Sequence, residues 1–127
     1  MDTPELQALV IDALEDIKGR DIETIDTRAL SALFDCIVVA TGDSNRQVRS
    51  LARNVADRVR AAGGDVISIE GEDNGEWVLV DLGNIVVHVL QPAVRNYYAL
   101  EELWASTPGS RQRYLKGKAL AEPRPAK

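Results

Sequence analysis

Trp77-Val78-Leu79-Val80-Asp81-Leu82-Gly83-Asn84-Ile85-Val86-Val87-His88-Val89-Leu90 is the stretch that decides the fold. Two runs rich in β-branched residues flank a Gly-Asn pair, which is the pattern of a β-hairpin with a two-residue turn. In that register Leu82 lies opposite Ile85, and directly opposed residues share one face of a sheet. One face is then entirely aliphatic and predicts a covering layer. It carries Val78, Val80, Leu82, Ile85, Val87 and Val89.

The opposite face of the hairpin, called the mixed face below, combines apolar area with a carboxylate and the only histidine of the chain. It carries Trp77, Leu79, Asp81, Val86, His88 and Leu90. One interpretation is a core tryptophan above a buried Asp81–His88 hydrogen bond, because buried polar groups are normally paired. The other is a recognition surface for a second molecule. The residues alone leave both interpretations open.

Length and composition indicate one globular domain. The chain has 127 residues, of which 45% are hydrophobic, enough for a modest single core. Its only cysteine, Cys36, excludes an internal disulfide and fits a reducing compartment; within an apolar run it predicts a small buried side chain. No apolar run approaches the roughly 20 residues of a membrane span, and the acidic N-terminus does not resemble a signal peptide. We therefore expect a cytoplasmic protein with no membrane partner.

Charge is unevenly distributed along the chain. The formal net charge is −5, but residues 106–127 contain six cations and one acid. The other residues therefore carry a charge of about −10, which repels phosphate backbones. We expect residues 1–106 to form the domain and to bind a basic protein surface. Residues 107–127 form a basic tail, expected to be disordered, and its charge makes it a candidate for contact with nucleic acid.

The remaining patterns predict the order α-β-β-α-β-β-β-α, an α/β fold with a mixed five-stranded sheet flanked by helices. The strand after Asp35 is continuously apolar, which indicates a central position. A right-handed crossover through the second helix predicts that strands two and three run parallel. The expected elements are a helix capped by Thr3 and stopped by Gly19, an edge strand at 21–26, the central strand ending at Thr41, a helix opened by a Ser44–Gln47 capping box and ended by Gly63-Gly64, a strand at 65–70, the hairpin, and a helix starting at Pro92.

Six linked motifs resemble the iojap family, the bacterial ribosomal silencing factors (RsfS), from Leu6 to Trp104. The motifs are Lys18-Gly19-x-Asp21-Ile22; Asp35-x-x-Val38-x-x-Thr41-Gly42-x-Ser44-x-Arg46-x-Val48; Glu70-Gly71; Trp77-x-Leu79-x-Asp81-x-Gly83; Val87-His88; and Arg95-x-x-Tyr98-x-Leu100-Glu101-x-Leu103-Trp104.

The resemblance implies a fold related to the nucleotidyltransferases without their activity. It also implies a non-enzymatic translation repressor that binds ribosomal protein L-fourteen on the large subunit. A factor bound there blocks joining of the small subunit. A part in large-subunit biogenesis and a homodimer are further implications, and nearness to ribosomal RNA would favour the basic tail as a weak RNA contact. No cofactor is expected.

Candidate binding residues combine the mixed face with the last helix. Trp, Tyr and Arg are the usual anchors of protein interfaces. Arg95 and Tyr98 lie one helical turn apart; Arg95 either pairs with Asp81 to hold the helix or faces the partner. The expected ribosomal-protein-binding residues are Trp77, Asp81, His88, Arg95, Tyr98 and Glu101.

An enzymatic alternative rests on weaker patterns. Gly42-Asp43-Ser44 stands between a strand and a helix N-terminus, where α/β proteins bind anions, and a residual nucleotidyltransferase would use Ser44 with Asp81. However, Asp81 has no acidic neighbour two residues away, so the paired carboxylates that hold magnesium are missing. No metal-ligand spacing is visible, and no catalytic residue or metal is expected.

The arginines of the second helix are a further alternative, because such a face is either solvated or a nucleic-acid contact. They are Arg46, Arg49, Arg53, Arg58 and Arg60.

Overall fold

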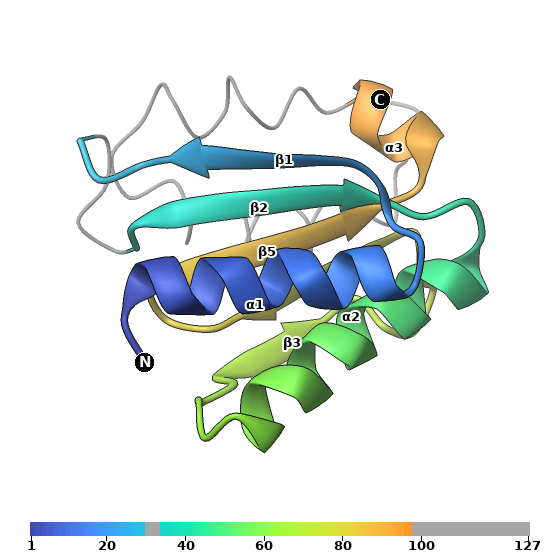
Figure 1. Ribbon diagram of the computed structural model, residues 1–127. Coiled ribbons are helices and arrows are strands. Elements are labelled where there is room, and N and C mark those ends of the chain that lie inside the picture. Colours follow the sequence, from blue (N-terminus) through green and yellow to red (C-terminus); the bar gives the residue numbers. More distant parts are fainter. Residues whose placement is uncertain (30–33, 98–127) are drawn as a thin grey trace.

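The computed structural model of the chain describes residues 1–29 and 34–97. Two long helices, α1 and α2, lie on one face of a five-stranded sheet, and α3 lies at one end of the strands (Figure 1). The elements are α1 (Thr3–Asp16), β1 (Arg20–Asp26), β2 (Cys36–Thr41), α2 (Asn45–Ala61), β3 (Ser68–Glu70), β4 (Trp77–Asp81), β5 (Ile85–Leu90) and α3 (Pro92–Tyr97).

The sheet has the order β1-β2-β5-β4-β3. β2 and β5 are parallel, whereas the other neighbours are antiparallel, so the predicted mixed five-stranded sheet is confirmed. β1 is an edge strand and β2 is buried along its whole length, as expected. β2 and β3 run in the same direction, but β5 and β4 lie between them. In the part of the chain described, no helix combines the length and apolar character of a membrane span.

The hairpin turns as predicted at Gly83-Asn84. The Leu82 N–H donates to the Ile85 carbonyl at 2.9 Å, and Gly83 has a φ of +92°. Glycine at the first central position of a two-residue turn supplies this conformation without strain. The Asp81 carboxylate accepts from the Gly83 N–H at 2.9 Å. The turn therefore fixes both the register of the hairpin and one contact of Asp81.

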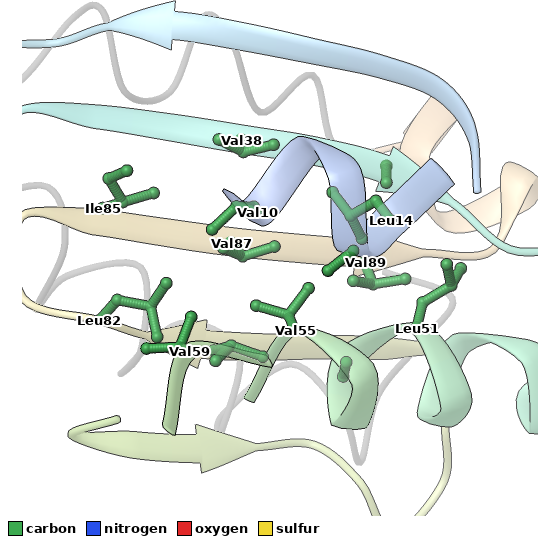
Figure 2. Packing of buried hydrophobic residues seen from close by; sticks show 14 of the residues in the cluster. Val10, Leu14, Val38, Leu51, Val55, Val59, Leu82, Ile85, Val87 and Val89 are labelled. Carbon is green, nitrogen blue, oxygen red and sulfur yellow. The ribbon is translucent and has the colours of Figure 1, made fainter. Parts of the chain in front are cut away.

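The aliphatic face of the hairpin forms the main core, under α1 and α2 (Figure 2). Val10 and Leu14 come from α1, and Leu51, Val55 and Val59 from α2; all five side chains are fully buried. Burying a valine or leucine side chain stabilises the fold by roughly 1.5–3 kcal/mol. This layer is the predicted cover, and it leaves the mixed face on the other side of the sheet.

The ends of α1 differ from the sequence prediction by one or two residues. Asp2, not Thr3, is the N-cap, and it forms a capping box with Glu5. The Thr3 hydroxyl instead donates to the Asp35 carboxylate at 2.7 Å and so ties α1 to the start of β2. The helix is capped by Ile17, and Lys18 rather than Gly19 has the positive φ, +63°. The local Asp2–Glu5 capping box decides where α1 begins.

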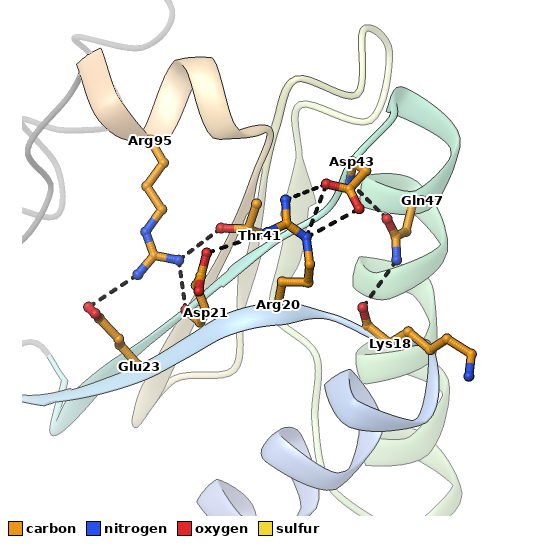
Figure 3. Close-up of polar contacts among 8 residues, drawn as sticks. All are labelled: Lys18, Arg20, Asp21, Glu23, Thr41, Asp43, Gln47 and Arg95. Carbon is orange, nitrogen blue, oxygen red and sulfur yellow. Dashed lines mark hydrogen bonds and ion pairs between the residues drawn. The ribbon is translucent and has the colours of Figure 1, made fainter.

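Gln47 joins the two long helices (Figure 3). Ser44 caps α2 as predicted, by accepting from the Gln47 N–H at 3.1 Å. The Gln47 side chain, however, accepts from the Asp43 N–H at 2.7 Å and donates to the carbonyls of Ile17 and Lys18 at 3.2 and 3.3 Å. It thereby satisfies carbonyls at the end of α1 that have no partner within the helix.

β3 is shorter than the predicted strand 65–70. The Ile67 N–H donates to the Asp81 carbonyl at 2.8 Å, and β4 ends there because the hairpin turns at Gly83. Residues 65 and 66 therefore have no further length of β4 to pair with. α3 begins at Pro92 as predicted; its expected continuation, the domain boundary after residue 106 and the basic tail lie outside the described residues.

Candidate protein-binding site

Apolar side chains of three central strands form a second cluster on the mixed face. Ile25 from β1 and Val94 from α3 pack against it while remaining partly exposed. Val94 therefore places the first turns of α3 on this face of the sheet, away from α1 and α2. The buried members are Phe34, Ile37, Val39, Trp77, Leu79, Val86 and Leu90.

Trp77 and His88 form a buried pair within this cluster. The Trp77 Nε1–H donates to Nδ1 of His88 at 3.4 Å, and the ring centroids lie 6.4 Å apart at an angle of 45°. Indole nitrogen is only a donor, so Nδ1 of His88 is the acceptor, which is the arrangement of the tautomer that carries its proton on Nε2. Trp77 is 6% exposed and His88 is fully buried.

Asp81 does not make the predicted hydrogen bond to His88. Asp81 is opposite Val86, whereas His88 is opposite Leu79, so the two side chains are staggered along neighbouring strands. Asp81 is 2% exposed, and its carboxylate accepts from the Gly83 N–H. The core interpretation was therefore right about burial and wrong about the partner of His88.

Two exposed acids flank the buried centre of the mixed face. The strand registers place Glu23, Val39, His88, Leu79 and Glu70 in one row across the sheet. Glu23 on β1 and Glu70 on β3 are exposed at its two ends. Sequence analysis missed both acids, because their place in this row depends on which strands form the edges.

Arg95 connects α3 to β1, the edge strand on the far side of the sheet from β3 (Figure 3). Its Nη1 donates to the Asp21 carbonyl at 2.7 Å and to the Thr41 hydroxyl at 2.9 Å, and its Nη2 lies 3.1 Å from the Glu23 carboxylate. The Arg95 side chain is only 15% exposed. The expectation that Arg95 holds the helix is met through Glu23 rather than through Asp81.

A bulge in β1 shapes the surroundings of Arg95. Arg20 is opposite Thr41 and Glu23 is opposite Val39, so β1 has one residue more than β2 over this interval. Asp21, inside the bulge, has a φ of +50°. Beside it lies an open cavity of about 500 Å³. The cavity is lined by Arg20, Asp21, Ile22, Glu23, Thr41, Pro92 and Arg95.

The residues proposed for nucleotide chemistry have structural roles. Asp43 forms an ion pair with Arg20, and hydrogen bonding from Arg20 lowers the pKa of the Asp43 carboxyl. Ser44 caps α2. Asp81 shares a row with Ile37, four residues before Thr41 on β2, which at 3.3 Å per residue is about 13 Å along the strand. Ser44 and Asp81 are therefore not brought together.

The arginine-rich face of α2 mainly makes contacts within the domain. Arg49 donates to the carbonyls of Glu72 and Asp73 at 2.7 and 3.0 Å. Arg53 pairs with the Glu72 carboxylate at 3.0 Å. These bonds fix the loop that leads into the hairpin, and Arg58 pairs with α1. The nucleic-acid interpretation of this face is weakened, because three of its five arginines already have partners.

The expected site residues therefore fall into three groups. Trp77, Asp81 and His88 lie buried on the mixed face, and Arg95 lies at its edge. Tyr98 and Glu101 lie outside the described residues. Within residues 1–29 and 34–97, no group of three or more metal-ligating side chains is found.

Comparison with known proteins relates the whole chain to one family. Residues 1–127 match the family model described as "Ribosomal silencing factor during starvation". The chain is 55% identical over 104 residues to the ribosomal silencing factor RsfS of Chromobacterium violaceum, covering 82% of this chain and 85% of that protein. It is 40% identical over 96 residues to the RsfS of Bacillus subtilis, covering 76% and 81% of the two chains.

A crystal structure of a Chromobacterium violaceum protein, CV0518, has the same fold. It superposes with a TM-score of 0.80 at 55% identity, covering 82% of this chain and 87% of the other. The mixed sheet with its flanking helices is thus shared with an experimentally determined structure. By sequence and by fold, the chain belongs to the ribosomal silencing factor family.

Proposed function

We propose that this protein is a non-enzymatic translation repressor that binds ribosomal protein L-fourteen on the large subunit and sterically blocks joining of the small subunit. The observation that carries the proposal is the mixed face with α3, set in a chain of the ribosomal silencing factor family. A part in large-subunit biogenesis belongs to the same proposal, because it requires binding to the same particle.

Charge supports a basic partner. Glu70 is exposed at one end of the mixed face, Glu23 at the other end is paired with Arg95, and the chain before residue 106 carries about −10. Complementary charge mainly raises the rate of association and selects the partner. Ribosomal proteins that contact RNA through basic surfaces fit this requirement, whereas exposed RNA phosphates are repelled.

The buried residues act from beneath the surface. Trp77, Asp81 and His88 hold the central strands and the hairpin turn in place, so they determine the shape of the surface that the partner meets. Tyr98 and Glu101, which follow α3 in the sequence, supply an aromatic anchor and an acid for direct contact. Arg95 belongs to the same surface and links it to β1.

Silencing in this proposal needs no chemistry. A domain of this size placed on the intersubunit side excludes the small subunit by volume alone. Asp81 lies about 13 Å along the strand direction from Thr41, where β2 ends before the Gly42-Asp43-Ser44 segment, so the geometry gives no support to a nucleotidyltransferase site that uses Ser44 and Asp81.

Sedimentation of mixed ribosomal subunits tests the proposal. Purified large and small subunits are combined with and without the protein and separated on a sucrose gradient. We expect the protein to travel with the large subunit and the amount of joined particle to fall. A protein that stays at the top of the gradient, with joining unchanged, contradicts the proposal.

Self-association is the second interaction proposed for this chain. A homodimer formed through the mixed face and α3 would compete with ribosome binding. Light scattering over a dilution series measures the dimer directly. If dilution to monomers increases binding to the large subunit, the two interactions share a surface; unchanged binding shows that they do not.

A further inference from the structure

We infer that the Arg95 site, made of the Glu23 carboxylate, the Thr41 hydroxyl and the Asp21 carbonyl, positions α3 for partner binding. The inference rests on the proposed function and deepens it. It assigns Glu23 and Thr41 a role in recognition, and it makes Arg95 a positioning residue rather than a direct contact.

The contacts of Arg95 span three elements. α3 follows β5 after a single residue, Gln91, and the Arg95 N–H donates to the Gln91 carbonyl at 3.0 Å. The side chain then reaches β1 through Asp21 and Glu23, and β2 through Thr41. A planar guanidinium with donors in fixed directions restricts orientation more than a single point charge does.

The β1 bulge creates the acceptors. In a regular strand the Asp21 carbonyl would belong to the β1–β2 ladder, but the register skips residues 21 and 22. The positive φ of Asp21 directs this carbonyl to Arg95 instead. Bulges commonly re-aim groups near functional sites. Here the bulge costs β1 part of its pairing and supplies one of the three acceptors for α3.

The first residues of α3 are largely exposed. Pro92 and Ala93 are exposed and Val94 is only partly buried. The Arg95 site therefore contributes strongly to the direction of α3. The sequence continues from Tyr97 directly to Tyr98, so that direction sets where the predicted contact residues begin.

Removal of Glu23 distinguishes positioning from direct contact. If Arg95 itself binds the partner, Glu23→Gln releases its guanidinium and leaves binding unchanged or stronger. If Arg95 positions α3, the same variant weakens binding. Asp26→Asn is the matched control, because it also removes one carboxylate from an exposed ion pair on β1, with Arg28, and does not touch α3.

The first measurement is binding of fluorescently labelled variants to purified large subunits. A partly exposed ion pair contributes at most about 1 kcal/mol. Losing that much binding free energy lowers the affinity roughly fivefold. We expect about fivefold weaker binding for Glu23→Gln and for Thr41→Val, and binding within twofold of wild type for Asp26→Asn. Arg95→Met combined with Glu23→Gln should be no weaker than Arg95→Met alone, because both changes remove one interaction.

The second measurement is amide hydrogen exchange of the free protein. Glu23→Gln and Thr41→Val should speed exchange at the N–H of Arg95, while amides inside α1 and α2 keep the wild-type rate. This readout separates a local change in α3 from general destabilisation, because a fold-wide loss accelerates all three helices together.

The outcomes are distinct. Wild-type protein that fails to bind large subunits overturns the proposed function, and the positioning role falls with it. Wild-type protein that binds, with Glu23→Gln equal to Asp26→Asn or tighter than wild type, overturns the positioning role alone. Weaker binding of Glu23→Gln together with faster exchange confined to α3 supports it.

Discussion

Trp77 donates its indole N–H to Nδ1 of His88 across the β4–β5 hairpin, at 3.4 Å and with both rings buried. In this contact Nδ1 of the chain's only histidine is the hydrogen-bond acceptor. It also links the aromatic residue at the start of β4 to the strand at the centre of the sheet. The stability of the mixed face is therefore expected to depend on the pair rather than on either ring alone.

We expect Trp77→Phe to lower the free energy of unfolding by about 1–2 kcal/mol, because the buried imidazole loses a donor and the site loses volume. His88→Phe should cost a similar amount. Urea unfolding of the two single variants and the double variant gives the coupling energy, expected to be about 1 kcal/mol. Additive losses would show that the hydrogen bond contributes nothing beyond packing.

Gly42→Ala tests whether the Gly42-Asp43-Ser44 segment is a nucleotide loop or a packing contact. A Cβ at this position would lie 2.9 Å from Val48 Cγ2 and 3.1 Å from the Val48 nitrogen, so we expect a loss of about 1–3 kcal/mol by overpacking. Ser50→Ala, on the exposed side of α2, should stay within about 0.5 kcal/mol of wild type.

The same pair of variants can be heated with millimolar ATP and magnesium. A ligand that binds the native state raises the melting temperature. We expect no shift for wild type or either variant. A nucleotide-dependent shift in wild type that disappears in Gly42→Ala would restore the nucleotide-binding interpretation.

Cys36 provides a pH-dependent prediction. Burial, followed by the nearby carboxylates of Asp26 and Asp35, raises the pKa of its thiol from 9.0 to about 11. The unfolded chain loses this proton first as the pH rises, so the free energy of unfolding should fall between about pH 9 and pH 11. Cys36→Ala should reduce that fall, as measured by urea unfolding at each pH.

Thiol labelling checks the same residue independently. At pH 8 the native Cys36 thiol is protonated and 4% exposed, and the thiolate is the reactive form. Iodoacetamide should therefore modify the native protein far more slowly than the protein in urea. Equal rates would show that β2 opens readily, which contradicts its place at the centre of the sheet.

Tyr98→Ala tests the predicted aromatic anchor. Interface anchors of this kind contribute about 2 kcal/mol or more, so affinity for the large subunit should fall roughly 30-fold. Tyr114→Ala, in the basic tail after the last of the six motifs, is the matched control and should bind as wild type does. If Tyr98→Ala and Tyr114→Ala bind the large subunit equally well, Tyr98 is not an anchor of the site. The proposed function is then tested by the binding of the wild-type protein.

The local pattern of the chain was enough to predict the hairpin, the central strand and the start of α2 at its Ser44 cap. Gly83 with its flanking β-branched runs specifies a turn and a register, and the continuous apolar run of β2 specifies burial on both faces. The capping and strand-end details were less predictable. Gln47 and Ile67 take roles set by neighbours that are distant in sequence, whereas Asp2 caps α1 through a local capping box with Glu5.

The proposed binding surface was likewise predictable only in part. The sequence identified Trp77, Asp81, His88 and Arg95 as unusual, because aromatic, ionisable and guanidinium groups interrupt apolar runs. Only the tertiary structure decided that His88 pairs with Trp77 and that Arg95 binds at the β1 bulge. Side-chain alternation follows from the backbone geometry of each strand, so the sequence by itself determines which residues share a face. The order of the other strands, and which carbonyls of β1 are left without a ladder partner, depend on pairing and bulges that only the packed sheet defines.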